Sequence, residues 1–229
     1  FTPYLEDMRR RLYFLCVSFI VVFITGFLGT GKIIKFILSL FDIKDVVIAT
    51  TSPFQFADLS VNIGLAVASL ICCPLLVYHI FSFLSPALSK KEKKSFVVVL
   101  PLSVTLFSAG FVYGFFILYY ALITLARINN SIGVQNIWDV GTFLSQIIIT
   151  ATLLGVLFQF PIVVSYLIRM GLMDVTLLRS KRKIAVFIIF IFATLLPPTD
   201  GLSLIAMVLP LTLLYELTIL ANSRVRRSE

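Results

Sequence analysis

The sequence has 229 residues, of which 59% are hydrophobic and only 13% are charged. Soluble domains carry roughly 45–50% apolar and about 25% charged residues, so this composition excludes a wholly soluble protein and makes lipid the solvent for part of the chain. The net charge of +8 fits Lys and Arg that face the cytoplasm and anionic lipid. It does not predict a nucleic-acid partner.

Six long apolar runs follow one another along the chain. A membrane span needs about 20 apolar residues, and continuous rather than alternating apolar runs indicate helices rather than barrel strands. The first run is longer than the apolar region of a signal peptide, so we expect it to be retained. We therefore expect an all-α integral membrane protein that forms a single polytopic domain over residues 1–229, with spans at about 12–29, 57–83, 96–122, 140–168, 184–196 and 202–220.

The last two expected helices are short. The fifth run has about 13 residues, or about 20 Å of helix, and it ends at Pro197 and Pro198. Such a length requires local thinning of the bilayer or a re-entrant hairpin with the sixth run. Between the first two spans, residues 32–41 form a short apolar stretch with Lys32 and Lys35 on one side, which fits a helix lying in the outer interface.

The basic residues predict the orientation. Four of the 19 Lys and Arg residues, Lys32, Lys35, Lys44 and Arg127, fall in loops on one side of the predicted topology. All the others fall on the opposite side, in alternate loops and at the two ends of the chain. Cytoplasmic loops carry the excess of Lys and Arg. We therefore expect both termini to be cytoplasmic, which requires an even number of spans.

The sequence contains no recognisable catalytic set. It lacks H-E-x-x-H, G-x-S-x-G and phosphate-loop motifs. Its three cysteines, Cys16, Cys72 and Cys73, lie inside apolar runs, and His79 is the single histidine. We interpret these residues as packing residues, and we predict no enzyme activity, no metal site and no cofactor.

Two polar residues inside the apolar runs are candidates for function. Glu216 lies in the sixth run, where a carboxylate costs about 2.5–3.5 kcal/mol on insertion scales. It either lines a functional hollow or reaches the inner headgroups near Arg224. Gln159 lies in the fourth run, where an amide can join helices by hydrogen bonding. Asp58 opens the second run and is interpreted as an interfacial charge at a helix start.

Acidic residues also stand among the basic residues of the predicted cytoplasmic side. Glu6 and Asp7 precede the first span, and Glu92 lies among four lysines. Each either balances local positive charge or offers a carboxylate to a cationic guest.

Several motifs resemble those of one membrane family, and they occur in the same order. The most specific is the stretch from Phe83 to Lys94, which resembles F-x-x-P-A-L-x-x-x-E-[KR]-[KR]. Near the N-terminus, residues 4–12 resemble H-L-x-E-L-R-x-R-L and residues 52–54 resemble S-P-x. Further along the chain, residues 158–161 resemble F-E-x-P and residues 195–200 resemble T-P-P-D. In the last run, residues 214–217 resemble L-[YF]-E-[IL]. This family is TatC, the receptor subunit of the twin-arginine protein translocase.

The chain resembles a divergent member of this family. Tyr4 stands where the family usually has His, Gln159 where it usually has an intramembrane Glu, and Tyr120 where it often has Pro. Either Thr199 or Asp200 takes the place of the family Asp in the turn before the last span.

The resemblance implies a function without an enzymatic step. Such a subunit recognises twin-arginine signal peptides on folded cargo, nucleates the translocation complex and uses the proton gradient. It works as an oligomer with small single-span subunits of the TatA and TatB type, in lipid of the plasma (cytoplasmic) membrane or of an organellar membrane. A small-solute secondary transporter is the alternative, but it predicts repeated halves, and the sequence shows no internal repeat.

The same resemblance assigns two groups of residues. Carboxylates are expected to pair with guest guanidinium groups, and aromatic rings to pack against apolar guest residues. The signal-peptide group consists of Asp7, Arg9, Phe81, Phe83, Pro86 and Glu92. The group for intramembrane polar and partner contacts consists of Gln159, Pro161, Glu216 and Asp200.

Overall fold

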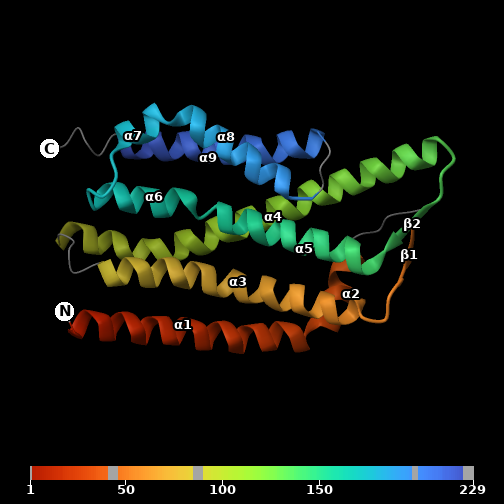
Figure 1. Ribbon diagram of the computed structural model, residues 1–229, viewed down its shortest axis with the longest axis horizontal. Helices are drawn as coiled ribbons and strands as arrows, with labels where there is room; N and C mark the ends of the chain where they lie inside the picture. The colour runs from red at the N-terminus through yellow and green to blue at the C-terminus, as the bar shows by residue number, and fades with distance from the viewer. Residues whose placement is uncertain (1, 41–45, 85–89, 198–200, 224–229) are drawn as a thin grey trace.

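Long helices lie alongside one another through most of the length of the molecule (Figure 1). The computed structural model describes residues 2–40, 46–84, 90–197 and 201–223. The elements in chain order are α1 (Thr2–Leu28), α2 (Thr30–Leu40), β1 (Val46–Ala49), α3 (Gln55–Leu84), α4 (Lys90–Ser131), β2 (Asn136–Asp139), α5 (Val140–Leu157), α6 (Phe160–Arg169), α7 (Val175–Ser180), α8 (Arg182–Leu195) and α9 (Gly201–Ser223). The start of α1 and the end of α9 lie at the same end of this bundle.

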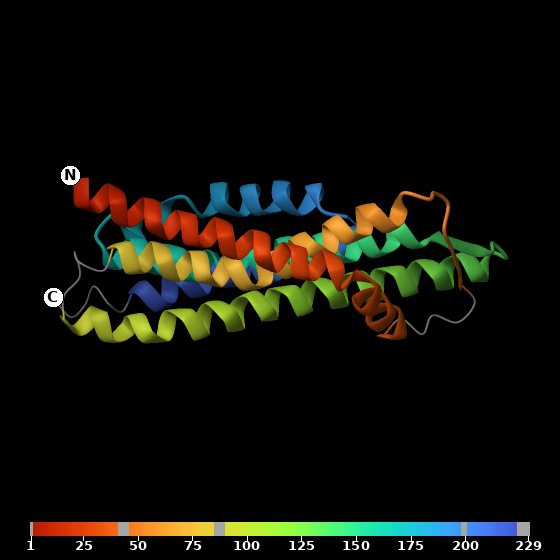
Figure 2. The same ribbon diagram turned by 90° about the horizontal axis from the view of Figure 1, so that it is seen from below.

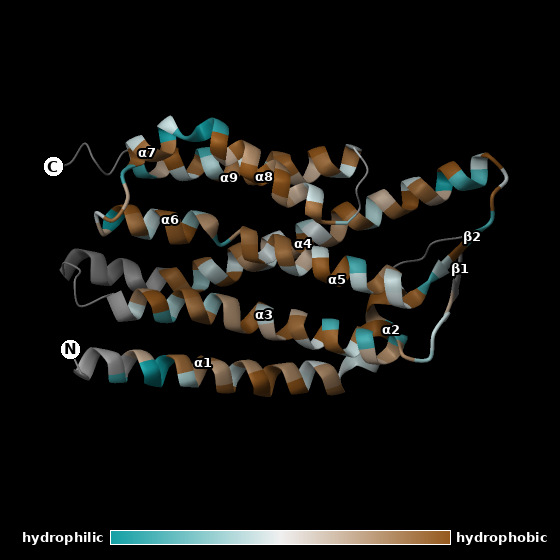
Figure 3. Cartoon of the chain, viewed as in Figure 1, coloured by the Kyte–Doolittle hydropathy of each residue, from teal (hydrophilic) through white to brown (hydrophobic). Residues whose placement is uncertain are grey.

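Five helical stretches are long and apolar enough to cross a membrane. They are Met8–Leu28, Gln55–Ser82, Val99–Ser131, Val140–Arg169 and Gly201–Ser223. Apolar residues predominate along these stretches, whereas polar ones gather toward the helix ends (Figure 3). The fifth expected span, residues 184–196, falls on α8, which has 14 residues and is too short to be included by length.

The helices pack in two connected groups. α1 packs against α3, and α3 packs against α4 and α5. The long α4 makes its most extensive contact with α5 and also reaches α9, which packs against α6 and α8. Figures 1 and 2 show α1 at one edge of the molecule. Much of α1 is left exposed, as expected for a helix that faces lipid or another protein.

Glycines bring α4 and α5 close together. A Cβ on Gly110 would lie 2.7 Å from the main-chain oxygen of Leu154, and one on Gly114 would lie 2.8 Å from Cα of Ala151. Gly155 faces the Phe107 ring in the same way, at 3.0 Å. Membrane helices gain no hydrophobic driving force from one another, so such small residues allow the close contact that holds them together.

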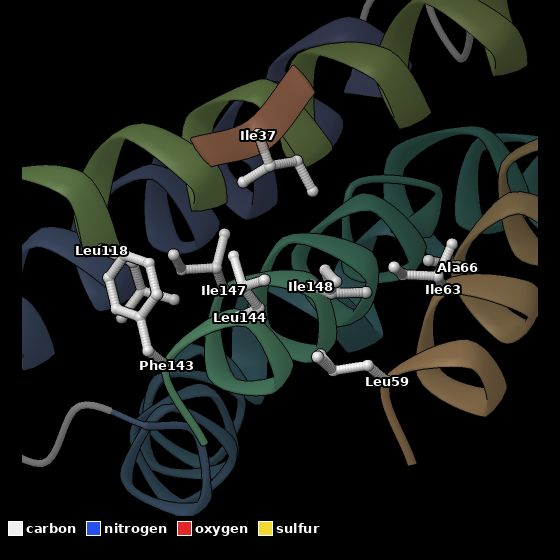
Figure 4. Close-up of a cluster of buried hydrophobic side chains, with 9 residues drawn as sticks. All are labelled: Ile37, Leu59, Ile63, Ala66, Leu118, Phe143, Leu144, Ile147 and Ile148. Atoms are coloured by element: carbon white, nitrogen blue, oxygen red, sulfur yellow. The ribbon is translucent and has the colours of Figure 1, made fainter. Parts of the chain in front are cut away.

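An apolar core joins the helices near the two strands. Leu59 and Ile63 of α3 meet Leu144 and Ile147 of α5 in this cluster, and Ile37 comes from α2 (Figure 4). One face of α2 therefore packs on the bundle, while Lys32 and Lys35 on the other face are exposed. This division is that of an amphipathic helix, as the sequence predicted for this segment.

Two short parallel strands join the segments that follow α2 and α4. Val46 to Ala49 pair with Asn136 to Asp139 in register. The expected all-α class is thus corrected to a mostly helical fold with one small sheet. Asp139 caps α5 by accepting a hydrogen bond from the Thr142 amide at 2.8 Å, and it also accepts from Thr51 and Gln55.

The expected span over residues 140–168 corresponds to the apolar stretch Val140–Arg169, and a break divides this stretch. α5 ends at Leu157 and α6 begins at Phe160. Pro161 is in the first turn of α6, where its missing N–H is tolerated, but its ring is incompatible with the carbonyl one turn earlier. Pro161 is thus compatible with the break, which leaves Gln159 between two helices.

Candidate functional site

A shallow hollow lies beside the start of α1. The described residues that line it are Glu6, Arg9, Arg10 and Tyr13, and its volume is about 470 Å³. Of the expected signal-peptide residues, Arg9 is therefore placed on an open surface next to an acid. The described lining offers one carboxylate, two guanidinium groups and one aromatic ring.

Phe81 is placed in the interior. Its side chain is 2% exposed and stacks on Tyr166 of α6 with ring centroids 3.9 Å apart. The Tyr166 hydroxyl donates to the main-chain oxygen of Phe81 at 3.3 Å. This placement differs from the expected contact with a guest peptide, because the ring is already covered and holds the end of α3 against α6.

The remaining expected signal-peptide residues cannot be compared with the structure. Pro86 lies outside the described residues, and the side chains of Asp7, Phe83 and Glu92 also fall outside the description. Asp200 of the second group lies outside it as well. Their roles therefore stay predictions from the sequence.

Gln159 joins the break between α5 and α6 to α4. It is 3% exposed, and its amide nitrogen donates to the main-chain oxygen of Ser103 at 2.9 Å. The Ser103 hydroxyl donates back to the Gln159 side-chain oxygen. The uncharged amide thus acts as a link between helices, in a place where a partner protein has no direct access to it.

Glu216 has a partner that the sequence did not reveal. Its carboxylate accepts a hydrogen bond from Arg182, at the first position of α8, with an N–O distance of 2.8 Å. Both side chains are partly exposed, at 38% for Glu216 and 48% for Arg182. Glu216 is therefore stabilised by an ion pair between α8 and α9, an alternative to the predicted reach toward Arg224.

His79 lies among aromatic rings. Its ring meets that of Phe14 edge to face at a centroid distance of 5.7 Å, and it meets Tyr78 at the same distance. Among the described residues, no group of three or more His, Cys, Asp or Glu side chains could hold a metal ion. His79 therefore joins α1 to α3 by packing.

A family model described as Sec-independent protein translocase protein (TatC) matches residues 3–210. Two curated relatives cover most of the chain. TatCy of Bacillus subtilis (strain 168) is 28% identical over 98% of this chain and 89% of its own length. TatC of Halalkalibacterium halodurans is 30% identical over 94% of this chain and 86% of its own length.

A solved structure is similar over nearly its whole length. It is a crystal structure of the twin-arginine translocase receptor TatC in DDM, with a TM-score of 0.83 and 27% identity, and the match covers 96% of this chain and 99% of that one.

Proposed function

The chain belongs to the TatC family of Sec-independent protein translocases, and we propose that it is the subunit that recognises twin-arginine signal peptides on folded cargo. It is a translocase subunit of the cytoplasmic membrane and not an enzyme, and the transporter alternative has no support among its relatives. The similarity of the whole chain to a solved translocase receptor carries this proposal.

Six membrane crossings with both termini in the cytoplasm are the proposed topology. Five crossings are assigned to the long apolar stretches and one to α8, whose 14 residues span about 21 Å. Support comes from the start of α1 and the end of α9, which lie at the same end of the bundle (Figure 1). The distribution of Lys and Arg would place that end in the cytoplasm.

The signal peptide is proposed to bind beside the start of α1. The hollow next to Glu6 and Arg9 provides an open surface there. Asp7 and Glu92 would add carboxylates, which suit the planar guanidinium groups of two arginines. Phe83 and Pro86 would contact the apolar part of the peptide, with Phe81 supporting the end of α3 from inside.

Small single-span subunits of the TatA and TatB type are proposed as partners in an oligomer. Of the four residues assigned to their contact, Glu216 has a side chain that reaches the surface in the described structure. Gln159 would act indirectly by fixing the break, as would Pro161, while Asp200 keeps its assignment from the sequence.

Export of a folded reporter with a twin-arginine signal tests the function. The chain should restore export in a cell that lacks its own TatC, and a twin-lysine reporter should stay in the cytoplasm. Failure with a well-expressed, membrane-inserted chain would argue against the translocase role in that cell.

Crosslinking to a twin-arginine peptide tests the site. Glu92→Lys should abolish the crosslink, and Glu92→Gln should weaken binding by around tenfold, the value of one charge-assisted hydrogen bond. Asp174→Lys is the matched control, because it makes the same charge change at an exposed residue before α7. Equal crosslinking by Glu92→Lys and the parent would refute the proposed pocket.

A further inference from the structure

Two apolar cavities meet where α6, α7, α8 and α9 come together. The first has a volume of about 240 Å³ and is lined by Phe160, Ile188, Phe192, Leu211 and Tyr215, among others. The second, of about 230 Å³, is also lined by Phe160 and Tyr215 and extends past Leu177 to Lys181. Because they share two residues, we treat them as one feature and call it the Phe160–Tyr215 groove.

The lining of both cavities is predominantly apolar. The Phe160 and Tyr215 rings, which line both cavities, stack with centroids 5.9 Å apart. The Tyr215 hydroxyl donates a hydrogen bond to the main-chain oxygen of Leu178 at 2.7 Å. It is therefore already bonded within the protein. An apolar cavity of about 150 Å³ is enough to hold a benzene molecule, so each half of this groove can hold a segment of an acyl chain.

Basic residues are concentrated in the segment that carries Lys181, a lining residue of the second cavity. Residues 169–183 include five basic residues and one acid, Asp174. Glu216 is paired with Arg182 of this segment. Lys181 lines the groove itself, is exposed and makes no ion pair among the described residues. A phosphate at this point would therefore meet a lysine that has no carboxylate partner in the part of the chain that the structure describes.

We propose that the Phe160–Tyr215 groove binds one anionic phospholipid, with an acyl chain between α6, α8 and α9 and the phosphate at Lys181. Basic pockets between membrane helices bind anionic headgroups in this way. The proposal goes beyond the translocase function, although the assignment to the inner leaflet depends on the proposed topology. The lipid would fill the space between α6 and the α8–α9 pair and fix their separation.

Lipid binding by the purified chain tests the proposal. Phosphatidylglycerol and phosphatidylcholine with the same oleoyl chains are titrated into delipidated protein in detergent, and bound lipid is counted by native mass spectrometry. Phosphatidylglycerol should bind about tenfold more tightly and raise the melting temperature more. Equal binding of the two lipids would overturn the proposal, and so would equal binding of glycerol phosphate, which has no acyl chain.

Matched variants locate the headgroup. Lys181→Gln should weaken phosphatidylglycerol binding about fivefold, the effect of one basic side chain near an anionic lipid surface. Lys35→Gln makes the same charge change on the exposed face of α2 and should leave binding unchanged. Both side chains are exposed, so both variants should fold. Equal affinities for Lys181→Gln and the parent would refute the assignment.

A further variant tests the part of the groove that would hold the acyl chain. Ala185 is half-buried and lines the first cavity, so Ala185→Leu should fill space that the acyl chain needs. It should weaken binding while keeping or raising the melting temperature without lipid. A photo-reactive residue at Ile188 should form a lipid adduct in membranes. A protein adduct that phosphatidylglycerol does not displace would show that a partner helix occupies the groove and would overturn the proposal.

Discussion

Gln159 and Ser103 exchange two hydrogen bonds across the interface between α4 and the break that separates α5 from α6. The Gln159 amide nitrogen donates to the main-chain oxygen of Ser103 at 2.9 Å, and the Ser103 hydroxyl donates to the Gln159 amide oxygen. Ser103 is fully buried. The pair is therefore a polar link within an apolar region, and its contribution can be measured.

A double-mutant cycle should show coupling between these two residues. Gln159→Leu and Ser103→Ala each remove one partner, so each should lower stability by about 1 kcal/mol. The double variant should lose less than the sum, by about 0.6 kcal/mol, the average for membrane helix pairs. Unfolding in mixed micelles measures this value. The main-chain oxygen of Ser103 remains in Ser103→Ala, so the cycle reports on the hydrogen bond of the Ser103 hydroxyl. Strict additivity would mean that this hydrogen bond contributes nothing.

Glycine-mediated packing predicts a large effect at Gly110. A Cβ there would meet the main chain of Leu154 and the side chain of Phe158 at distances below 3.0 Å. Gly110→Ala should therefore separate α4 from α5 and destabilise the protein by about 1–3 kcal/mol, the range for overpacking.

Gly31→Ala is the matched control for this change. A Cβ on Gly31 meets nothing within 4 Å, and Ala is favoured over Gly in a helix by about 1 kcal/mol. The control should be neutral or slightly stabilising in the same thermal unfolding assay. Similar melting temperatures for the two variants would contradict the close packing of α4 on α5.

Asp139 predicts that acid lowers the stability of the end of the bundle that carries the two strands. Hydrogen bonds from the Thr51 side chain and the Thr142 amide hold its pKa well below the usual range. A lowered folded-state pKa stabilises the fold above the unfolded value of about 4, and this stabilisation is lost as the pH falls below that value. The melting temperature of the parent should therefore drop on acidification.

The Asn variant isolates this contribution. Asp139→Asn keeps a side chain that can cap α5 but removes the titrating carboxylate. Between about pH 6 and about pH 3, its melting temperature should change less than that of the parent. Identical pH profiles for the two proteins would remove Asp139 as the cause.

The ion pair between Glu216 and Arg182 predicts that removing either charge has the same effect on export. Because both side chains are partly exposed, the pair should contribute only about 0.2–1 kcal/mol. Glu216→Gln and Arg182→Gln should lower export equally if pairing alone matters, and the exchange Glu216→Arg with Arg182→Glu should restore most of it. A loss in Glu216→Gln alone would instead indicate a direct role for the carboxylate.

Hydropathy predicted the long helices because lipid fixes both the length and the composition of a span. It could not predict which prolines interrupt them. Pro74, Pro101 and Pro210 lie inside helices that continue past them, whereas α6 begins at the residue before Pro161. In membranes, neighbouring groups can satisfy the backbone that a proline frees, so the outcome depends on tertiary surroundings.

Contacts between residues that are far apart in the sequence account for most of the features that the sequence did not reveal. The two strands are separated by the whole of α3 and α4, and Arg182 stands 34 residues before Glu216. By contrast, Gly110 and Gly114 form a G-x-x-x-G motif in an apolar run. That motif is a recognised signal of close helix packing, so the α4–α5 contact could have been predicted.

Cysteine labelling tests the proposed topology, with α8 as the critical element. In a background without Cys16, Cys72 and Cys73, single cysteines replace Ser180 before α8 and Ser131 at the end of α4. Both positions are exposed, and an impermeant thiol reagent should reach them from opposite sides of the membrane. Labelling from the same side would contradict the proposed crossings.

Gly201→Cys then decides whether α8 crosses. Gly201 begins α9, is exposed, and has nothing within 4 Å of its added Cβ, so the substitution should not disturb packing. If the 14 residues of α8 cross a thinned bilayer, this cysteine should be labelled from the same side as the one at Ser131. A 14-residue helix reaches about 21 Å, whereas the hydrocarbon core is about 30 Å thick. The cysteine at position 201 should therefore be labelled quickly only if the bilayer is thin at α8. Labelling from the side of Ser180 would contradict a crossing by α8. Because the start of α1 and the end of α9 lie at the same end of the bundle, α8 and α9 would then form a re-entrant hairpin.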